Sequence, residues 1–324
     1  MLILLFEPWN LGDAFIAASI ARADPDRIVL ACNSRWHEVL RLASHNSLNL
    51  LPLDLPYVWR TGKKYFSLGA AASLRSAFSA EQLSTMRIIS IRGDIRDCLA
   101  AHRIFNGASF SFTGWRPFLA RKLSIFDRPF ASGSLKVRNR YRAWAEAAGI
   151  PFSTVEQYYP VPSGKEDKAP VVIHTGAQWR SKQYPHVVEL AKQLKNVGCR
   201  VELVAGPNDA LPPGISAGEV RRPAWPELIS LFRSAGYVIS NDSGPMHLAA
   251  FLGCRTIALS RCSNIDEWLP PGVTALSSPS APHGYRPIPA YWSDQTLTDW
   301  PLPNEVTAVI ENASKFGNQE VLKP

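Results

Sequence analysis

The stretch Ser234–Ser260, SAGYVISNDSGPMHLAAFLGCRTIALS, decides the fold of the second half of the chain. Residues 237–240 are apolar or β-prone and predict a buried strand, which the turn residues 241–244 then end. Pro245 suits the first turn of a helix, where its missing N–H costs nothing, and Gly253 is placed to end that helix. Residues 255–259 predict the next strand, so the order is that of a βαβ unit.

The turn between this strand and this helix is a candidate phosphate site. Free backbone N–H groups point out of a helix N-terminus and favour an anion there. Gly244 would let a phosphate approach the backbone closely. The alternative is an ordinary βα loop capped by Asp242 or Ser243, and the residues alone do not decide between the two.

Length and composition indicate a soluble globular protein with anionic partners. The chain has 324 residues, which suggests two domains with sizeable cores. Hydrophobic residues make up 46% and charged residues 19%. The formal net charge is +8 and the pI about 9.3, which favours anionic partners.

The cysteines and the N-terminus indicate the compartment. Five scattered cysteines contain no CxxC pair, and several lie in apolar runs, so we expect buried free thiols and a reducing environment. Residues 1–6 are too short for the apolar region of a signal peptide, and no run approaches the length of a membrane span. We expect a cytoplasmic protein that can still touch a membrane surface.

The first half alternates strand and helix signals. Strands are predicted at 2–6, 27–32 and 87–92, and helices at 14–23, 36–43 and 137–148. This rhythm predicts an α/β fold with a doubly wound parallel sheet. The polar segment 165–168 between prolines reads as the linker, so we expect an N-terminal domain of residues 1–164 and a C-terminal domain of residues 165–324.

The second half restarts the same rhythm. Strands are predicted at 171–174 and 200–205, and helices at 185–196 and 225–234, before the Ser234–Ser260 stretch. Residues 261–303 are rich in proline and aromatic residues without periodicity, which predicts a long loop region. Residues 305–316 predict a last amphipathic helix.

Three segments resemble one enzyme family. The string Asn241–Ala250, NDSGPMHLAA, looks like the nucleotide-sugar signature of the heptosyltransferase family, glycosyltransferase family 9. Gly12-Asp13 and His174–Pro185 are similar to two further family segments, in the same order. The resemblance implies a GT-B fold, with two Rossmann-like domains facing a cleft. It also implies inverting, metal-independent transfer of heptose or a related sugar from a nucleoside-diphosphate donor such as ADP-heptose, with no separate cofactor.

Asp13 is the candidate general base. It follows the first predicted strand, and open α/β sheets bind ligands at the carboxyl ends of their strands. An aspartate at this position is commonly a helix N-cap, which the residue alone favours. The resemblance instead assigns Asp13 to the base that takes the proton from the acceptor hydroxyl.

The segment His174–Pro185, HTGAQWRSKQYP, is the second candidate contact for the diphosphate. It is similar to the family's H-P-G-A…K-x-W-P, with Thr175 replacing the usual Pro and Tyr184 the usual Trp. The resemblance assigns Lys182 to the departing diphosphate, with Arg180 as a second positive charge. The alternative is a solvated basic loop.

The resemblance places the donor site in the C-terminal domain. Asp209 or Asn208 occupies the place of the family's ribose ligand, whereas Trp225 could stack on a base or pack in the core. His174 and His247 are more often structural histidines than bases, and His247 is included only as a neighbour. The donor-binding set is Thr175, Gly176, Arg180, Asp209, Trp225, Asp242, Ser243, Gly244, Pro245, Met246 and His247.

A basic run in the first half is the candidate acceptor surface. Residues 113–142 carry eight basic residues against one acid, either as a solvated face or as a surface for an anionic acceptor. The family's acceptors are anionic glycolipids of the lipopolysaccharide core, reached at the cytoplasmic face of the inner membrane, so we favour the second. The acceptor-binding set is Arg60, Lys63, Lys64, Arg116, Arg138 and Arg140.

Other functions remain as alternatives. The triplet Asp24-Pro25-Asp26 sits between a helix and a strand and predicts a turn, and no histidine motif suggests a metal site. The rival functions are another GT-B nucleotide-sugar enzyme, with a different donor or an epimerase activity, and a catalytically silent nucleotide-sugar-binding protein. No basic motif interleaved with aromatic residues suggests nucleic-acid binding, and we expect a monomer.

Overall fold

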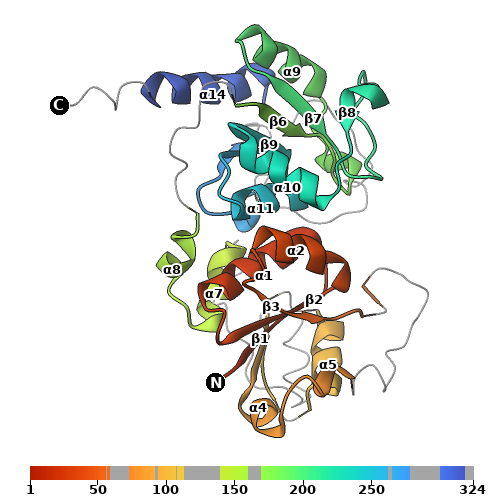
Figure 1. The fold of residues 1–324 in the computed structure, drawn as a ribbon, viewed down its shortest axis with the longest axis vertical. Coiled ribbons are helices and arrows are strands. Elements are labelled where there is room, and N and C mark those ends of the chain that lie inside the picture. Colours follow the sequence, from red (N-terminus) through yellow and green to blue (C-terminus); the bar gives the residue numbers. More distant parts are fainter. Residues whose placement is uncertain are drawn as a thin grey trace, which may run out of the picture. The chain divides into compact units, whose positions relative to one another are not determined.

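The computed structural model describes residues 1–55, 57–58, 73–91, 94–106, 108–112, 139–159, 169–261, 265–277 and 300–317. The chain divides into two compact units, unit 1 (Met1–Tyr158) and unit 2 (Tyr159–Pro324). Each unit is built on one parallel sheet with helices packed against it (Figure 1). The predicted boundary between residues 164 and 165 falls outside the described residues.

Unit 1 holds a parallel sheet in the order β3-β2-β1-β4-β5. The chain runs outward from β1 to β3, then returns to pair β4 with the other edge of β1, so the switch point of the topology lies between β1 and β4. The strands are β1 (Ile3–Glu7), β2 (Ile28–Cys32), β3 (Asn49–Pro52), β4 (Arg87–Ser90) and β5 (Ser109–Phe112). The sequence predicted three of these strands, and β3 and β5 were missed.

The helices of unit 1 confirm most of the predicted pattern. They are α1 (Leu11–Ala23), η1 (Ser34–Trp36), α2 (His37–Ala43), α4 (Ala80–Thr85), α5 (Ile95–Ile104), α7 (Arg140–Ala148) and α8 (Phe152–Glu156). Helix α1 begins at Leu11, three residues before the predicted start at residue 14, so Asp13 lies inside the helix. Gly149 ends α7 in the left-handed region with φ +70°, the conformation that glycine adopts at least cost.

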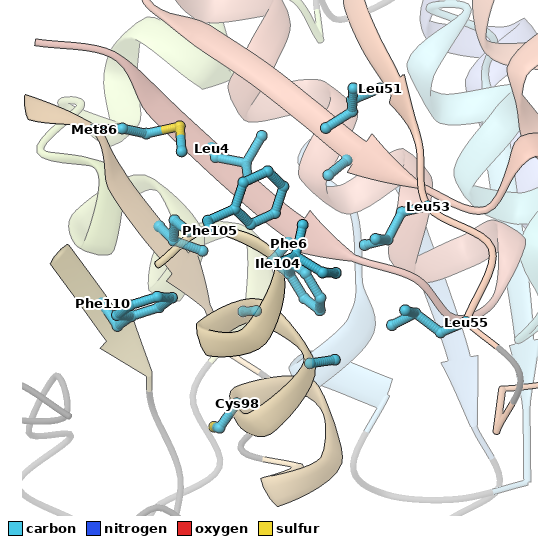
Figure 2. Packing of buried hydrophobic residues seen from close by; sticks show 14 of the residues in the cluster. Leu4, Phe6, Leu51, Leu53, Leu55, Met86, Cys98, Ile104, Phe105 and Phe110 are labelled. Carbon is cyan, nitrogen blue, oxygen red and sulfur yellow. The ribbon is translucent and has the colours of Figure 1, made fainter. Parts of the chain in front are cut away.

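Alternation along β1 distributes its side chains to two layers. Leu4 and Phe6 belong to a buried cluster with Ile104 and Phe105 at the end of α5, and Figure 2 shows these side chains gathered between the sheet and α5. Successive strand residues face opposite sides of a sheet, so Ile3 and Leu5, also buried, face the other layer. Helices α1 and α7 pack against each other there, which makes the unit doubly wound (Figure 1).

Unit 2 repeats the topology with one more strand. Its sheet has the order β11-β10-β9-β6-β7-β8, and every recorded pairing is parallel. The strands are β6 (Val171–His174), β7 (Val201–Val204), β8 (Val220–Arg221), β9 (Tyr237–Asn241), β10 (Thr256–Ser260) and β11 (Thr274–Ser277). The switch point here lies between β6 and β9.

The Ser234–Ser260 stretch folds as predicted, whereas the region after it does not. Strand β9, helix α11 and strand β10 follow one another, and Gly253 has φ +75°. The prediction of a long loop over 261–303 was wrong in part, because α12 and β11 form within it. The helices of unit 2 are η2 (Arg180–Lys182), α9 (Val187–Asn196), η3 (Ala217–Glu219), α10 (Trp225–Ser234), α11 (Gly244–Phe251), α12 (Ile265–Trp268) and α14 (Pro303–Gly317).

The cysteines follow the sequence prediction where they are described. Cys32, Cys98 and Cys254 are buried free thiols, Cys199 is half-buried and free, and Cys262 lies outside the described residues. Burial raises the pKa of the Cys32 thiol, so that group stays protonated and acts as a small apolar side chain.

Truncation of Phe105 tests the packing of α5 on the sheet. Phe105 is fully buried at the end of α5, so Phe105→Ala should lower the free energy of unfolding of unit 1 by about 3–5 kcal/mol. Leu99 on the same helix is 50% exposed, and Leu99→Ala should cost no more than about 0.5 kcal/mol. Hydrogen exchange of the β1 amides reports unfolding of this unit, and equal costs for the two variants would contradict the packing described here.

Candidate functional site

The candidate donor site lies at the carboxyl ends of the strands of unit 2. Residues 175–182 follow β6, residues 206–209 lie in the loop after β7, and residues 242–243 join β9 to α11. Strands β6 and β9 flank the switch point, which is where open α/β sheets bind ligands. The structure therefore brings the two predicted phosphate segments together although they are far apart in the sequence.

Asn241 joins these two segments through its buried amide. Its Nδ2 donates to the carbonyl oxygens of Thr175 and Gly176 at 3.1 and 3.0 Å, and its Oδ1 accepts from the Tyr184 N–H at 2.9 Å. The residue is 1% exposed. Sequence reasoning treated Asn241 only as a turn residue. Its place at the end of a buried strand was the available signal, because a buried amide must find partners.

Lys182 lies beside the signature turn. Its Nζ donates to Asp242 Oδ2 at 2.7 Å, and it stands 5.4 Å from the centre of the Trp179 ring. The side chains of Lys182 and Asp242 are 25% and 12% exposed. The alternative of a fully solvated Lys182 is therefore wrong, because its ammonium is paired with a carboxylate and lies over an aromatic ring.

The start of α11 offers backbone N–H groups to an anion. Ser243 is the N-cap, but its side chain makes no capping bond, and its Oγ donates to the Asn241 carbonyl at 3.3 Å. Among the residues that the structure describes, no acceptor is recorded for the N–H groups of Ser243 and Gly244, whereas the Asp242 N–H donates to the Leu259 carbonyl at 3.2 Å. An uncapped helix N-terminus is a favourable place for a phosphate.

Asp209 approaches the β6 loop closely. Its Oδ2 accepts from the Gly206 N–H at 2.7 Å and lies 4.0 Å from His174 Nε2. A Cβ at Gly176 would lie 1.7 Å from the same oxygen, so this contact exists only because residue 176 is glycine. Arg222, which sequence reasoning missed, donates to the carbonyl oxygens of Gly206 and Asp209 and braces the loop.

His174 is a neutral imidazole at the end of β6. Burial lowers its pKa below the usual range, although the nearby Asp209 carboxylate acts in the opposite direction. The side chain is 5% exposed. A neutral, enclosed ring can donate or accept a hydrogen bond, and it adds no positive charge for a diphosphate.

The other predicted donor-binding residues differ in their burial and in their contacts. Thr175 is buried, and its Oγ1 donates to the Val204 carbonyl at 3.2 Å, so its hydroxyl is hydrogen-bonded to the end of β7. The Met246 side chain packs with Ala258 and Ile265 in a small core cluster. His247 is buried in the first turn of α11. Pro245 is half-buried in that turn, Arg180 is exposed on η2, and Trp225 is the half-buried first residue of α10.

Asp13 lies in unit 1, in the first turn of α1 after β1. The N-cap of α1 is Asn10, so the interpretation of Asp13 as a cap was wrong. The side chain is half-buried beside the switch point between β1 and β4, and the helix macrodipole favours a carboxylate there. Asp94 caps α5 in the same unit: its Oδ1 accepts from the Arg96 N–H at 2.9 Å.

Few of the predicted acceptor residues are described. Arg140 Nη1 donates to the Ile91 carbonyl at 3.1 Å, just beyond β4. Arg60, Lys63, Lys64, Arg116 and Arg138 lie outside the described residues. Asp24 and Asp26 lie in a turn, as predicted, where Arg27 Nε donates to Asp24 Oδ2 at 2.6 Å. Within the described ranges, no group of three or more His, Cys, Asp or Glu residues could hold a metal ion.

Comparison with known proteins identifies the class. The two doubly wound units have the GT-B fold of glycosyltransferases, which solved structures across nearly the whole chain also show. Residues 69–279 match the family described as "Glycosyltransferase family 9 (heptosyltransferase)", and the chain belongs to this family. A comparison with curated protein sequences found no match.

Three solved structures illustrate the likeness of fold. Escherichia coli heptosyltransferase WaaC with ADP has 16% identity and a TM-score of 0.66, over 96% of this chain and 99% of that chain. E. coli ADP-heptose lps heptosyltransferase II has 19% identity and a TM-score of 0.63, over 99% of both chains. A glycosyl transferase family 9 protein from Veillonella parvula DSM 2008 has 16% identity and a TM-score of 0.56, over 85% and 86%.

Gly176→Ala tests the contact with Asp209. The new Cβ must displace the carboxylate, and overpacking of this kind costs about 1–3 kcal/mol of unfolding free energy. Gly218→Ala is the matched control, because nothing lies within 4 Å of a Cβ there. In an Asp209→Gly background the cost of Gly176→Ala should largely disappear. Denaturant unfolding measures all of these variants, and equal costs with and without Asp209 would refute the contact.

Proposed function

We propose that this chain is an inverting glycosyltransferase that moves heptose or a related sugar from a nucleoside-diphosphate donor to an anionic glycolipid or glycan, such as the lipopolysaccharide core. The observation that carries the proposal is the ion pair of Lys182 with Asp242, which immediately precedes the uncapped start of α11 in unit 2. Related enzymes are described with ADP and with ADP-2-deoxy-2-fluoro heptose, which supports ADP-heptose as the donor.

The arrangement in unit 2 suits stabilisation of a leaving diphosphate. Negative charge grows on the diphosphate as the glycosidic bond breaks, and preorganised donors stabilise that charge. The Ser243 and Gly244 N–H groups would bind one part of the diphosphate, and the Lys182 ammonium another. Asp242 holds Lys182 in place without donor, so little reorganisation is needed when the donor arrives.

The nucleoside would occupy the ends of β6 and β7. In doubly wound nucleotide-binding units an acidic residue after the second strand binds the ribose. Asp209 follows β7, the second strand of unit 2, and Arg222 braces its loop. Trp225 at the start of α10 would stack on the base.

The acceptor would be activated in unit 1. Asp13 is our proposed general base for the acceptor hydroxyl, and attack of that hydroxyl on the anomeric carbon, opposite the departing diphosphate, inverts the configuration. Arg140 and the other predicted basic residues would attract an anionic acceptor, consistent with the net charge of +8.

The proposal also covers the cellular location of the protein and its need for a metal ion. No helix in the described part of the chain is long and apolar enough to cross a membrane. We propose a monomer on the cytoplasmic side of the inner membrane, in peripheral contact with it through basic residues.

We further propose that transfer of the sugar needs no metal ion. Turnover should therefore persist in excess EDTA, and loss of turnover that Mg²⁺ or Mn²⁺ restores would overturn metal independence.

Lys182→Ala tests the donor half of the proposal. Loss of a charge-assisted contact with the diphosphate is worth about 1.5–3 kcal/mol, so affinity for free ADP should fall roughly 10- to 150-fold. Lys195→Ala on the exposed part of α9 removes an equal charge and should leave that affinity unchanged. Isothermal calorimetry on the folded proteins measures both, and wild-type affinity in the Lys182 variant would move the diphosphate elsewhere.

Asp13→Asn tests the catalytic half. Removal of a general base should lower kcat about 10²–10⁴-fold while the affinity for ADP in unit 2 stays unchanged. Asp26→Asn removes an exposed carboxylate from the turn after the other end of α1 and serves as the control. Mass spectrometry of the glycolipid product formed from ADP-heptose gives the rates. Near-normal kcat in the Asp13 variant would exclude this residue as the base.

A further inference from the structure

Helix α1 begins without the usual side-chain cap, although it carries the proposed base. Asn10 is the N-cap, yet its side chain accepts no hydrogen bond from the first turn. A capping side chain commonly stabilises a helix by about 1 kcal/mol. The first turn of α1, with Asp13 in it, must therefore be fixed mainly by other contacts.

Trp9, in the loop between β1 and α1, supplies such contacts. Its indole Nε1 donates to Asp97 Oδ2 at 2.7 Å, and its backbone carbonyl accepts from Trp36 Nε1 at 3.0 Å. Its backbone N–H donates to Glu7 Oε1 at 3.2 Å. The loop is thereby tied to three separate elements, β1, η1 and α5.

Asp97 is the most deeply buried member of this set. It is fully buried in the first turn of α5, where the helix macrodipole favours a negative charge. Its second oxygen, Oδ1, accepts from the Tyr57 hydroxyl at 2.8 Å. A buried carboxylate is costly unless its oxygens are hydrogen-bonded, and here both oxygens are engaged by aromatic donors.

The aromatic rings are held as well as their polar atoms. The Trp9 and Tyr57 ring centres lie 6.0 Å apart, and the Arg96 guanidinium stands 5.1 Å from each ring. Arg96 is in turn oriented by Asp94, at 2.6 Å. Burial, and then the Asp97 carboxylate, raise the pKa of Tyr57, so its hydroxyl remains a hydrogen-bond donor at every working pH.

These contacts span the switch point of unit 1. Trp9 follows β1, whereas Asp97 begins the helix after β4, and β1 and β4 are the two strands between which the topology reverses. A hydrogen bond across this point joins the segment that carries Asp13 to the opposite half of the sheet.

We propose that Asp97 is a positioning residue that acts through Trp9 to hold the first turn of α1, and with it the Asp13 carboxylate, in the orientation that proton abstraction requires. The proposal rests on the function proposed above for Asp13. Neither Asp97 nor Trp9 needs to touch the acceptor. We call the Asp97–Trp9 hydrogen bond the clamp. A misplacement of about 1 Å in a catalytic group can cost about 10²-fold in rate, so loss of the clamp has a measurable effect.

Trp9→Phe is the sharpest variant, because it keeps an aromatic ring on the core and removes the indole N–H that Asp97 binds. The Ala14 amide, which closes the first turn of α1 by donating to the Asn10 carbonyl at 2.9 Å, should exchange with solvent roughly tenfold faster, as expected for loss of about 1.4 kcal/mol of local stabilisation. Asn49→Ala is the matched control: it removes one hydrogen bond, to the Pro25 carbonyl at 2.7 Å, at the amino end of the sheet. Unchanged exchange in Trp9→Phe overturns the clamp.

Kinetics separate positioning from a merely structural role. Trp9→Phe should lower kcat about tenfold and leave the affinity for ADP unchanged. In an Asp13→Asn background the same substitution should have no further effect on kcat, because the residue through which it acts is gone. Asp97→Asn keeps one carbonyl acceptor. It should likewise lower kcat when Asp13 is present and have no further effect on kcat in the Asp13→Asn background.

The outcomes distinguish this proposal from the proposed function. Sugar transfer by the wild type with independent, additive losses from Trp9→Phe and Asp13→Asn overturns the positioning role alone. A wild type that transfers no sugar overturns the proposed function, and with it the catalytic purpose of the clamp, whatever the exchange result. Faster amide exchange in Trp9→Phe, together with non-additive effects of Trp9→Phe and Asp13→Asn on kcat, supports both the positioning role and the proposed function.

Discussion

The candidate donor site depends on one buried amide. Asn241 ends β9, and its side chain binds the two carbonyl groups that follow β6 and the backbone N–H of Tyr184. A buried polar group left without its partner costs about 1–3 kcal/mol, so this network fixes the loop after β6 against the signature turn. Lys182 lies in that loop and Asp242 in that turn, and the Asn241 hydrogen bonds help to hold these two segments at the spacing that their ion pair requires.

Local signals explain what the sequence could predict of the fold. Helix α10 has a clear apolar period, and α11 is an apolar helix with Pro245 in its first turn and Gly253 after its end; both formed at the expected residues. Strands β3, β5 and β11 were missed because they are short edge strands, stabilised by pairing with a neighbour and not by a pattern of their own. The start of α1 was misplaced because Asn10 provides no side-chain cap.

The site was predictable only in its short motifs. Gly12-Asp13, Lys182 and the Asp242–Gly244 turn stand in segments that resemble the family, and unit 2 brings the last two together. The residues that support them were not predictable: Arg222 acts on a loop two elements before it, and Asp97 reaches Trp9 across the switch point between β1 and β4. Such long-range hydrogen bonds depend on strand order, which no local pattern contains.

The contact between Gly176 and Asp209 has a consequence for how this family can vary. A Cβ at position 176 and a carboxylate at position 209 cannot occupy the same space, so substitutions at the two positions are linked. A lineage that acquires a side chain at 176 must first shorten or redirect residue 209, and it then loses the acid at the end of β7. Stepwise substitution at this pair of positions is therefore constrained to begin at position 209, and glycine at 176 should persist wherever that acid is kept.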